Sequence, residues 1–357
     1  MRYVHGETMK VLVTGGAGFV GSHVAEYYAR TDCEVLVFDN LSRAELLNYD
    51  TSNAMYNWNY LKSGYDNIEM QKGDIRDADT IKNATSDVDV IIHTAAQTAV
   101  TTSMIDPRTD FEVNALGTFN VLEAARLSRA NPVVIFCSTN KVYGDNVNEM
   151  PVEARGGRYV FSDPNFRGIP ETFATDLCEH TPYGASKFAA DVYVQDYAAR
   201  GEVDAAVFRM SCIYGTRQFG VEDQGWVAWF TIATLLGRPI TIYGDGKQVR
   251  DMLYVTDLVA AFDAFVDRRD RLHRGVYNMG GGAENTMSLL ELLDMLEEIT
   301  GRRSEIGYDD WRPSDQKVYI SDISKARQEL GWVPEVAPRD GVGRLVSWVE
   351  ENEDVFR

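Results

Sequence analysis

Residues 10–22 read Lys-Val-Leu-Val-Thr-Gly-Gly-Ala-Gly-Phe-Val-Gly-Ser, and this stretch decides the fold. An apolar run typical of a buried strand leads into glycines with GxxGxxG spacing, and a stretch with helical periodicity follows. Gly15 permits a tight turn, Gly18 lets a pyrophosphate approach the backbone, and Gly21 lets the new helix pack closely on the strand. Phe19 and Val20 complete this turn, where helix N–H groups would face the anion. The stretch predicts the first βα unit of a dinucleotide-binding sheet.

The first half of the chain alternates apolar, β-branched runs with helical stretches, which is the signature of a parallel sheet covered on both faces. We expect an α/β fold: a Rossmann-type doubly wound parallel sheet with a smaller C-terminal α/β substrate-binding domain. Helices are expected at Val20–Arg30, Asp77–Ala84 and Asp106–Arg129. Strands are expected at Lys10–Thr14, Glu34–Asp39, Ile68–Lys72, Val88–His93, Val133–Ser138 and Asp204–Met210.

The second expected strand ends at Asp39, eighteen residues after Gly21. An acidic side chain there accepts hydrogen bonds from the adenosine ribose and repels a 2′-phosphate, which favours NAD over NADP. Arg43 would soften that preference. Asp74 follows the third strand, where the adenine edge is expected, although a position near a helix N-cap explains it equally well. The cofactor residues predicted in these two segments are Asp39, Asn40, Ser42, Arg43, Asp74 and Ile75.

Tyr183-Gly-Ala-Ser-Lys187 opens a helix and places a phenol and an ammonium one turn apart on the same face. A phenol has an unperturbed pKa of ~10, which is too high for a base near neutrality. An adjacent ammonium, helped by the positive nicotinamide ring, would lower the pKa of Tyr183, and Lys187 would also hold the nicotinamide ribose. Ser138 and Thr139 follow the fifth strand, where their hydroxyls would meet a substrate oxygen.

Seven segments, TGGAGFVGS, FDNLS, GDIRD, HTAAQ, VNALGT, STNKVYG and YGASK, stand in one order along the chain. In this the chain resembles the extended short-chain dehydrogenase/reductase family of NAD-dependent epimerases and dehydratases, over essentially its whole length. The resemblance implies that Tyr183 is the acid/base, that Lys187 lowers its pKa, and that Thr139, with Ser138, hydrogen-bonds the reacting hydroxyl. It adds Ala95 and Ala96 beside the pyrophosphate, with Gln97, and Asn114 as a support at the carboxyl edge of the sheet.

The family resemblance implies a shared first step, in which a sugar alcohol loses a proton to tyrosine and a hydride to NAD. In the family's 4,6-dehydratases the triplet after the fifth strand resembles Thr-Asp-Glu, whereas here it is Thr139-Asn140-Lys141, which argues against dehydration. Further segments resemble the branch that inverts carbon 2 of a CDP-hexose, the CDP-paratose to CDP-tyvelose type. They are STNKVYGD at 138–145, RQF at 217–219, DQGWV at 223–227, GKQVRD at 246–251 and SDQ at 314–316.

Three other functions stay open. They are a UDP-sugar 4-epimerase, a nucleotide-sugar 4,6-dehydratase and a non-catalytic NAD-binding regulator built on the same fold. A regulator would be expected to lack the Tyr183–Lys187 pair.

Arg250 and Arg312 are the leading candidates to bind the substrate's pyrophosphate, because a guanidinium can grip two oxygens at once. An ordinary ion pair in an acid-rich protein is the alternative for each. Tyr243 could stack on a base or belong to the core. The substrate-binding residues predicted are Thr139, Asn140, Lys141, Arg217, Gln224, Gly225, Tyr243, Arg250, Arg312 and Asp315.

After Arg217 the strand–helix alternation gives way to small strands, helices and glycine-rich turns. We expect residues 1–215 to form the NAD-binding Rossmann domain, with 251–268 returning to it. Residues 216–250 and 269–357 would form the sugar-nucleotide-binding domain. In that second part the small strands Pro239–Tyr243 and Val318–Ile320 and the helices Ser288–Thr300 and Ile323–Gly331 are expected. A long insertion at 145–179 is expected to be a functional loop.

The chain has 357 residues and a formal net charge of −19, which argues against nucleic acid or an anionic membrane as a partner. No run approaches the ~20 apolar residues of a membrane span. The four cysteines show no disulfide framework, and neither they nor the five histidines show metal-ligand spacing, so we expect a cytoplasmic enzyme without a metal. The helices Asp106–Arg129 and Ala185–Ala199 would pair with their copies as a four-helix bundle, the usual dimer of the family.

Overall fold

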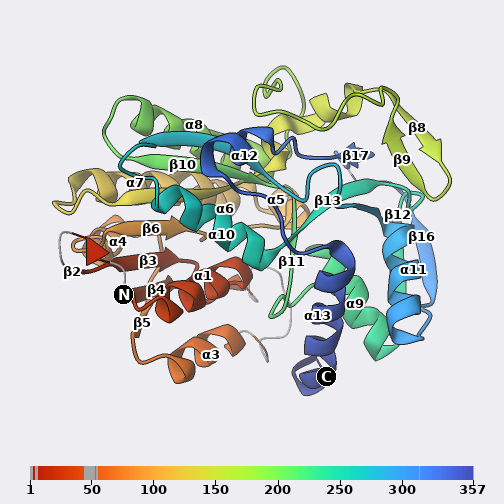
Figure 1. The fold of residues 1–357 in the computed structure, drawn as a ribbon, viewed down its shortest axis with the longest axis horizontal. Coiled ribbons are helices and arrows are strands. Elements are labelled where there is room, and N and C mark those ends of the chain that lie inside the picture. The colour runs from red at the N-terminus through yellow and green to blue at the C-terminus, as the bar shows by residue number, and fades with distance from the viewer. Residues whose placement is uncertain (1–2, 5–6, 44–52, 54, 313, 357) are drawn as a thin grey trace. The chain divides into compact units, whose positions relative to one another are not determined.

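The computed structural model describes residues 3–4, 7–43, 53, 55–312 and 314–356. The chain comprises two compact units, and Figure 1 labels their helices and strands. Unit 1 comprises Met1–Lys141, Pro182–Arg209 and Val259–Tyr277, and unit 2 comprises Val142–Thr181, Met210–Leu258 and Asn278–Arg357. The predicted assignment of a cofactor domain and a substrate domain stays a prediction.

A seven-stranded sheet forms the centre of unit 1, with the strand order β14-β10-β7-β6-β3-β4-β5. Its registered pairs β5–β4, β4–β3, β3–β6 and β6–β7 are all parallel. The strand order reverses at β3 and β6, which is the topological switch point where open α/β sheets bind ligands. The strands are β3 (Lys10–Thr14), β4 (Glu34–Asp39), β5 (Ile68–Lys72), β6 (Val90–His93), β7 (Val133–Thr139), β10 (Ala205–Met210) and β14 (Arg274–Met279).

These strands confirm the predicted α/β fold class. β3, β4 and β5 have the predicted bounds, and β6, β7 and β10 differ from them by one or two residues. All seven residues of β7 are buried, as expected for a central parallel strand with helices on both of its faces. β14 joins the edge of the sheet beside β10 and was not predicted.

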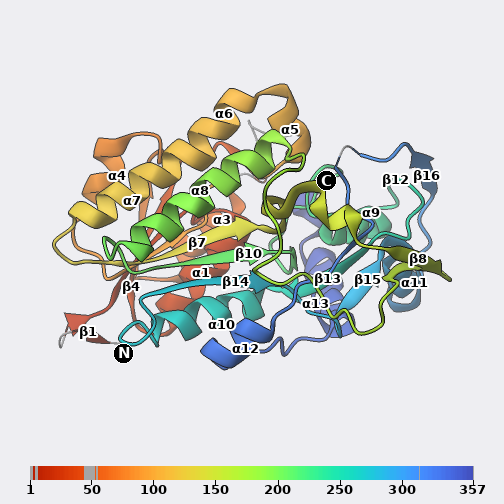
Figure 2. The same ribbon diagram turned by 90° about the horizontal axis from the view of Figure 1, so that it is seen from above.

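Helices cover both faces of this sheet, with α7 and α8 side by side on one face and α1 on the other (Figure 2). The predicted helix Asp106–Arg129 is continuous from Pro107 to Leu127 and contains a π-helical turn, η2 (Glu112–Leu116), between α6 (Pro107–Phe111) and α7 (Gly117–Leu127). The other helices are α1 (Phe19–Arg30), α3 (Tyr56–Gly64), α4 (Ala78–Ala84), α5 (Val100–Ile105), α8 (Pro182–Ala199) and α10 (Val255–Val266), and a short hairpin, β1 (Tyr3–Val4) with β2 (Glu7–Thr8), precedes the sheet.

Unit 2 holds a four-stranded sheet in which β13 (Val249–Tyr254) pairs with β11 (Cys212–Tyr214), β15 (Thr286–Ser288) and β17 (Val318–Tyr319). A second pair joins β12 (Ile240–Tyr243) to β16 (Ile306–Asp309). Its helices include α9 (Trp226–Leu236), α11 (Leu289–Thr300), α12 (Ser324–Leu330), α13 (Pro338–Glu351) and the 3₁₀ turn η4 (Glu353–Phe356). A capping box on Ser288 and Glu291 fixes the start of α11.

The insertion at 145–179 contains regular structure in addition to loop. It begins inside the 3₁₀ segment η3 (Asn140–Glu149) and continues as an antiparallel hairpin of β8 (Val152–Arg155) and β9 (Arg158–Phe161). Phe161 packs in a small apolar cluster with Val249 and Val318 of unit 2. Within the described residues, no helix combines the length and the apolar character needed to cross a membrane.

Candidate active site

Tyr183 lies in the first turn of α8, beside the end of β7. Its backbone N–H donates to the Ser103 hydroxyl over 3.1 Å, which ties the start of α8 to α5. The Thr139 side chain is close enough to the Tyr183 phenol to lower the pKa of that phenol. The structure therefore brings together Tyr183, the predicted acid/base, and Thr139, the residue predicted to hydrogen-bond the reacting hydroxyl.

Lys187 follows one turn later on α8 and is 2% exposed. Its ammonium lies 4.2 Å from the centre of the Phe136 ring on β7. Burial lowers the pKa of Lys187 to about 8, and the neighbouring Cys137, Asp191 and Asp110 act in the opposite direction. The residue is thus a buried cation whose charge depends on nearby groups.

Burial also decides the acidity of Tyr183. It raises the pKa of this phenol to about 12, and Thr139 partly offsets the rise, while the charges of Asp110 and Cys137 add to it. The sequence predicted a lowered pKa. In the folded chain desolvation has the largest effect and raises the pKa of Tyr183 instead, so the phenol needs further positive charge to act as a base near neutrality.

Ser138 is directed to a different group from Thr139, because successive side chains of a strand point to opposite faces. Its hydroxyl donates to Asp191 over 2.7 Å. Asp191 is fully buried and receives Arg209 from β10 at 3.0 and 3.1 Å. The predicted catalytic role of Ser138 is therefore not supported by its contacts, which tie β7 to α8 two turns beyond Tyr183.

Asn114 lies in the π-helical turn and is the centre of a buried hydrogen-bond network. Its Oδ1 accepts from the Gln97 backbone N–H over 2.9 Å, and its Nδ2 lies 3.0 Å from the Gln97 carbonyl and 3.1 Å from the Ser186 hydroxyl. The same Nδ2 lies 3.1 Å from Asp110. Asn114 thus joins the segment after β6 to α8, as the sequence predicted for a supporting residue.

His93, which ends β6, is a hydrogen-bonded core residue. Its two ring nitrogens lie 2.7 Å from the Thr14 hydroxyl and 3.0 Å from the Thr118 hydroxyl. Burial lowers its pKa to about 3, so the imidazole is neutral. Among the described residues no group of three or more His, Cys, Asp or Glu side chains has the arrangement of a metal site.

The glycine turn has the features that a dinucleotide requires. Gly15 has φ +67°, and a Cβ there would lie 2.6 Å from Ala95. A Cβ on Gly21 would lie 2.2 Å from the Gly15 carbonyl oxygen, so both positions require glycine. α1 begins after Gly18 without a side-chain cap, which leaves its first-turn N–H groups oriented for an anion. The turn fits a bound pyrophosphate, with Phe19 and Val20 opening the helix and Ala96 following Ala95.

The Asp39 carboxylate lies at the end of β4, next to this turn. It accepts the backbone N–H groups of Ala17 at 3.0 Å and Leu41 at 2.7 Å. Burial raises its pKa, which these two donors partly offset. The carboxylate therefore lies at the edge of the glycine turn, where the sequence placed the adenosine ribose.

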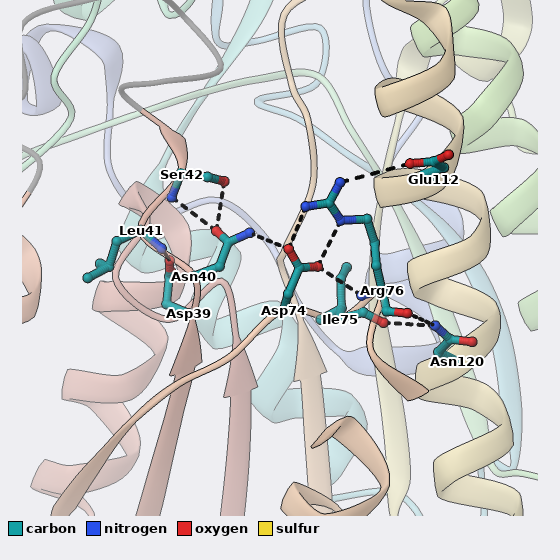
Figure 3. Close-up of polar contacts among 9 residues, drawn as sticks. All are labelled: Asp39, Asn40, Leu41, Ser42, Asp74, Ile75, Arg76, Glu112 and Asn120. Atoms are coloured by element: carbon teal, nitrogen blue, oxygen red, sulfur yellow. Dashed lines mark hydrogen bonds and ion pairs between the residues drawn. The ribbon is translucent and has the colours of Figure 1, made fainter. Parts of the chain in front are cut away.

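Asn40 connects this edge to Asp74 after β5 (Figure 3). Its Nδ2 donates to Asp74 over 3.0 Å, and its Oδ1 accepts both the backbone N–H and the hydroxyl of Ser42. Asp74 also holds Arg76, at 2.6 and 3.0 Å, and this guanidinium lowers the pKa of Asp74 to about 2. The N-cap of α4 is Asp77, so Asp74 does not cap that helix.

Ile75 and Arg43 differ from the other predicted cofactor residues. The Ile75 side chain is buried in the core of unit 1, so only its backbone is available to a ligand. Its carbonyl accepts the Asn120 amide over 3.0 Å. Arg43 is exposed and borders residues 44–52, which lie outside the described part of the chain.

Asn140 and Lys141 follow Thr139 directly, and Asn140 is buried. The Thr139 hydroxyl lies 3.3 Å from the Asn140 amide oxygen, and the Lys141 backbone N–H lies 3.3 Å from the Thr139 hydroxyl. An amide therefore flanks the Thr139–Tyr183 pair at the position where the dehydratase triplet would place a carboxylic acid.

In unit 2 the structure brings together two of the predicted substrate residues, Arg250 and Asp315. The Arg250 guanidinium donates to the Asp315 carboxylate over 2.6 Å and to the carbonyls of Gln316 and Val249 over 2.6 and 2.9 Å. Both side chains of the ion pair are mostly buried, at 13% and 20% exposed. β13 and the segment before β17 hold this pair in place.

Arg312 and Tyr243 form a second cluster in unit 2. The guanidinium of Arg312 lies 4.0 Å from the centre of the Tyr243 ring and 3.0 Å from Asp223. It also donates to the Glu222 carbonyl over 3.0 Å. The aromatic ring is thus covered by a cation, which accounts for Tyr243 without a base stacked on it.

The remaining predicted substrate residues form the turn before α9. Arg217 is buried and has φ +59°, a strained value for a residue with a side chain. Gln224 forms a reciprocal pair of backbone hydrogen bonds with Val221, at 2.9 Å each. Gly225 has φ +77° and is the N-cap of α9, where a Cβ would lie 2.9 Å from the Gln218 amide.

Sequence reasoning missed two buried carboxylates, Asp110 and Asp191. Both stand four residues from a predicted site residue, Asp110 before Asn114 and Asp191 after Lys187. That is one helical turn, so each lies on the same face as its neighbour. The signal was an acidic residue at a core-facing position of an expected helix.

The model of the NAD dependent epimerase/dehydratase family matches residues 11–280. The chain belongs to this family. Membership confirms the family predicted from the motifs, and NAD as the cofactor. The glycine turn and the Asp39 edge are consistent with that cofactor.

Three related proteins illustrate the similarity. The CDP-paratose 2-epimerase of Salmonella typhi is 39% identical over 95% of this chain and 99% of its own length. The UDP-glucose 4-epimerase of Thermus thermophilus, solved as a complex with NAD, is 30% identical with a TM-score of 0.77, over 96% of this chain and 99% of that one. The UDP-glucose 4-epimerase of Thermotoga maritima, solved with UDP-glucose, is 29% identical with a TM-score of 0.78, over 97% and 100%.

Proposed function

We propose that this NAD-dependent epimerase inverts carbon 2 of a CDP-hexose, in a reaction of the CDP-paratose to CDP-tyvelose type. The observation that carries the proposal is the 39% identity to a CDP-paratose 2-epimerase along the whole chain. The Thr139-Asn140-Lys141 triplet supports it, because an amide beside Thr139 provides no acid for water elimination.

In this proposal Tyr183 moves the proton and Thr139 orients the reacting oxygen. The Tyr183 phenolate takes the proton of the carbon 2 hydroxyl, and the Thr139 hydroxyl, which already contacts the phenol, stabilises the developing negative charge. When the ketone is reduced on its other face, Tyr183 returns the proton. NAD supplies the hydride acceptor and donor, so the cofactor is regenerated in each turnover.

The residues that hold NAD in this proposal come from three segments of unit 1. Gly15, Gly18 and Gly21 present α1 to the pyrophosphate, and Asp39 accepts the adenosine ribose hydroxyls. Lys187 holds the nicotinamide ribose. A cationic nicotinamide near Tyr183 would also provide the positive charge that a phenol with a pKa of about 12 needs to ionise near neutrality.

For the nucleotide we propose Arg250 and Arg312, as the sequence suggested. Each already holds a carboxylate, Asp315 and Asp223 respectively. A pyrophosphate would share or replace these partners, because guanidinium binds carboxylate and phosphate oxygens with the same geometry. We retain the predicted domains, with residues 1–215 and 251–268 for NAD and residues 216–250 and 269–357, which contain Arg250 and Arg312, for the nucleotide.

The second candidate is a UDP-sugar 4-epimerase, which the two solved 4-epimerases at 29% and 30% identity favour. Proton NMR of the enzyme with NAD and a panel of CDP- and UDP-hexoses separates the two. A manno-type signal from CDP-paratose that Tyr183→Phe abolishes is the expected result. Interconversion at carbon 4 of a UDP-sugar without any change in CDP-paratose would overturn the carbon 2 assignment.

We also propose a homodimer in which α6–α7 and α8 pack against their copies. Exposed apolar side chains gather on this part of unit 1, among them Phe111 at 57%, Val192 at 47% and Tyr193 at 48% exposed. A four-helix bundle would bury them. Light scattering should give twice the chain mass, and Tyr193→Glu should give the monomer. Tyr308→Glu, at a residue of unit 2 that is 62% exposed, is the matched control and should leave the mass unchanged.

A cytoplasmic location completes the proposal. The four cysteines all lie in the described residues and are free thiols. Free thiols are typical of a reducing compartment. Recovery of activity with the cytoplasmic fraction of the source cell would test the location.

A further inference from the structure

Asp110, on α6, is a buried acid that the proposed reaction does not use. Its side chain is 1% exposed and lies against α8, which carries Tyr183 and Lys187. Its Oδ2 lies 2.5 Å from the hydroxyl of Ser186, the residue between that pair on the helix. Its Oδ1 lies 3.1 Å from the amide nitrogens of both Gln97 and Asn114. Because burying a carboxylate costs free energy, the position of Asp110 next to an acid/base pair requires a physical explanation.

The orientation of the two amides makes Oδ1 of Asp110 a hydrogen-bond acceptor. The Asn114 Oδ1 accepts a backbone N–H from Gln97, and the Gln97 Oε1 accepts a backbone N–H from Ala99. A backbone N–H can only donate, so both amide oxygens are assigned and both NH₂ groups face Asp110. One carboxylate oxygen therefore receives two donors and the other receives the Ser186 hydroxyl. Burial raises the pKa of Asp110, and the Ser186 hydroxyl and the charge of Lys187 partly offset the rise and favour the charged form.

Two buried carboxylates act on Lys187, and only one of them has a cationic partner. Asp191 is held by Arg209 at 3.0 Å, so its charge is largely neutralised. The described partners of Asp110 are all neutral. Its negative charge is thus left to interact with the ammonium of Lys187, to which it is electrostatically coupled.

We propose that Asp110 is a positioning residue whose carboxylate is the buried counter-charge of Lys187 and sets the pH range in which Tyr183 exchanges its proton. This inference rests on the proposed acid/base role of Tyr183. It does not depend on which sugar carbon is inverted. Asn114 lies in the π-helical turn that follows α6, one turn after Asp110.

The direction of the effect follows from the charges. Beyond the dominant effect of burial, Asp110 raises the pKa of Tyr183 and raises the pKa of Lys187. Removing its charge should therefore lower both. Other groups that interact electrostatically with Asp110, Tyr183 or Lys187 include Asp106 before α6, Asp191 on α8, Cys137 on β7 and His93 on β6. His93 is neutral, because burial lowers its pKa to about 3, and burial raises the pKa of Cys137 to about 12.

The test is Asp110→Asn, which removes the charge and keeps the shape. The asparagine oxygen can accept from Gln97 and Asn114, and its NH₂ can donate to Ser186, whose hydroxyl then turns to the Tyr183 carbonyl 3.1 Å away. Tyrosine labelled with ¹³C at Cζ gives the ionisation midpoint of Tyr183 directly by NMR, and Tyr183→Phe identifies its signal. We expect the midpoint in the NAD-bound enzyme to fall by about one pH unit in Asp110→Asn.

Kinetics give a second measurement. The bell-shaped pH profile of kcat/KM should move to lower pH on both limbs, because the acidic limb follows Tyr183 and the basic limb follows Lys187. Glu112→Gln is the matched control. It removes the same charge two residues further on, from a side chain that is 36% exposed, and should leave midpoint and limbs unchanged. Asp110→Glu, which keeps the charge, should restore the wild-type midpoint.

A purely structural tie between α6 and α8 predicts a different result. Asp110→Asn would then lower thermal stability or kcat while the Tyr183 midpoint and both limbs stayed in place, and this would overturn the proposal. Asp110→Ser is a second neutral variant, should the asparagine not fold, and the same fall is expected of it. The NMR midpoint needs no substrate, so it holds or fails independently of whether CDP-paratose is turned over.

Discussion

The cationic side chains of the two candidate regions differ in their burial and in their ionic partners. These regions lie around Lys187 in unit 1 and around Arg250 and Arg312 in unit 2. Lys187 is 2% exposed and lies over an aromatic ring, near a carboxylate held by neutral donors. Each arginine is already paired with a carboxylate, at 2.6 Å for Arg250 and 3.0 Å for Arg312. The first arrangement controls the protonation state of Lys187. The second holds two guanidinium groups in place, and an incoming anion can bind their N–H donors.

This difference suggests that burial, more than the number of ion pairs, decides what a charged residue does in this chain. A buried charge without an ionic partner shifts pKa values, and a buried pair is costly to break. A partly exposed pair such as Arg312–Asp223, at 26% and 38% exposed, exchanges partners at a smaller cost. Four substitutions test this ordering, and the expected effects decrease from the first to the last.

Tyr183→Phe should have the largest effect. It removes only the phenolic oxygen, and with it the group proposed to carry the proton, so kcat should fall by about 10³-fold or more. The fall is measured by NMR turnover of CDP-paratose. NAD binding, followed by fluorescence of bound NADH, should be retained because the glycine turn is untouched. A variant that lost less than tenfold in kcat would remove Tyr183 from the proposed chemistry.

Arg209→Met should have the next largest effect, on stability. It leaves Asp191 buried without its cation, which costs about 3–5 kcal/mol of unfolding free energy for a broken buried pair. Urea unfolding measures the loss. Arg126→Met is the matched control, because the Arg126–Glu123 pair is 34% and 29% exposed, and should change the unfolding midpoint little. Equal losses in the two variants would show that burial does not set the energetics of these pairs.

The sequence predicted the sheet of unit 1 closely because a local pattern of neighbouring residues marks each strand. β3 and β4 are mainly apolar runs, the ends of β3, β4 and β5 are marked by glycine or acidic residues, and the bounds of all three agree with the prediction. The π-helical turn η2 was not predictable, because one extra residue in a helical turn leaves the apolar periodicity almost unchanged. The hairpin β8–β9 had a signal that was missed, since Gly156-Gly157 separates two alternating runs.

The residues of the candidate site also fall into those that the sequence could locate and those that it could not. Tyr183, Lys187, Thr139 and the glycine turn could be located from spacing, because the chemistry itself requires that spacing. Ser138 could not be separated from Thr139 by sequence, since only the fold shows that its hydroxyl donates to Asp191. The contact between Asp110 and Ser186 joins residues 76 positions apart, and no local pattern reports such a pairing.

Arg250→Ala should have a smaller effect, and on binding more than on chemistry. A charged hydrogen bond to a phosphate contributes about 1.5–3 kcal/mol, so KM for the CDP-sugar should rise by roughly 10- to 100-fold with kcat little changed. Steady-state kinetics measure both constants. Arg339→Ala, which removes an exposed pair with Glu298 at 2.8 Å, is the control and should leave KM unchanged. A fall in kcat with constant KM would place Arg250 in the chemical step instead.

Asp74→Asn should have the smallest effect, although Asp74, like the Asp191–Arg209 pair, belongs to unit 1. Its side chain is 27% exposed and that of its partner Arg76 is 39% exposed, so solvent screens the pair. Arg76 lowers the pKa of Asp74 from 3.8 to about 2, and a folded-state pKa below the unfolded value stabilises the protein above that unfolded value.

The contribution of Asp74 should therefore be complete above pH 4 and be lost as the pH falls toward 2. Allowing for screening, Asp74→Asn should cost about 1 kcal/mol of unfolding free energy at pH 7, and the difference from wild type should shrink between pH 4 and pH 3. Urea unfolding over this range measures it, and 1 M salt should reduce the difference at pH 7. If Asp74→Asn cost as much as Arg209→Met and resisted salt, membership of unit 1 rather than burial would separate the strong charges from the weak ones.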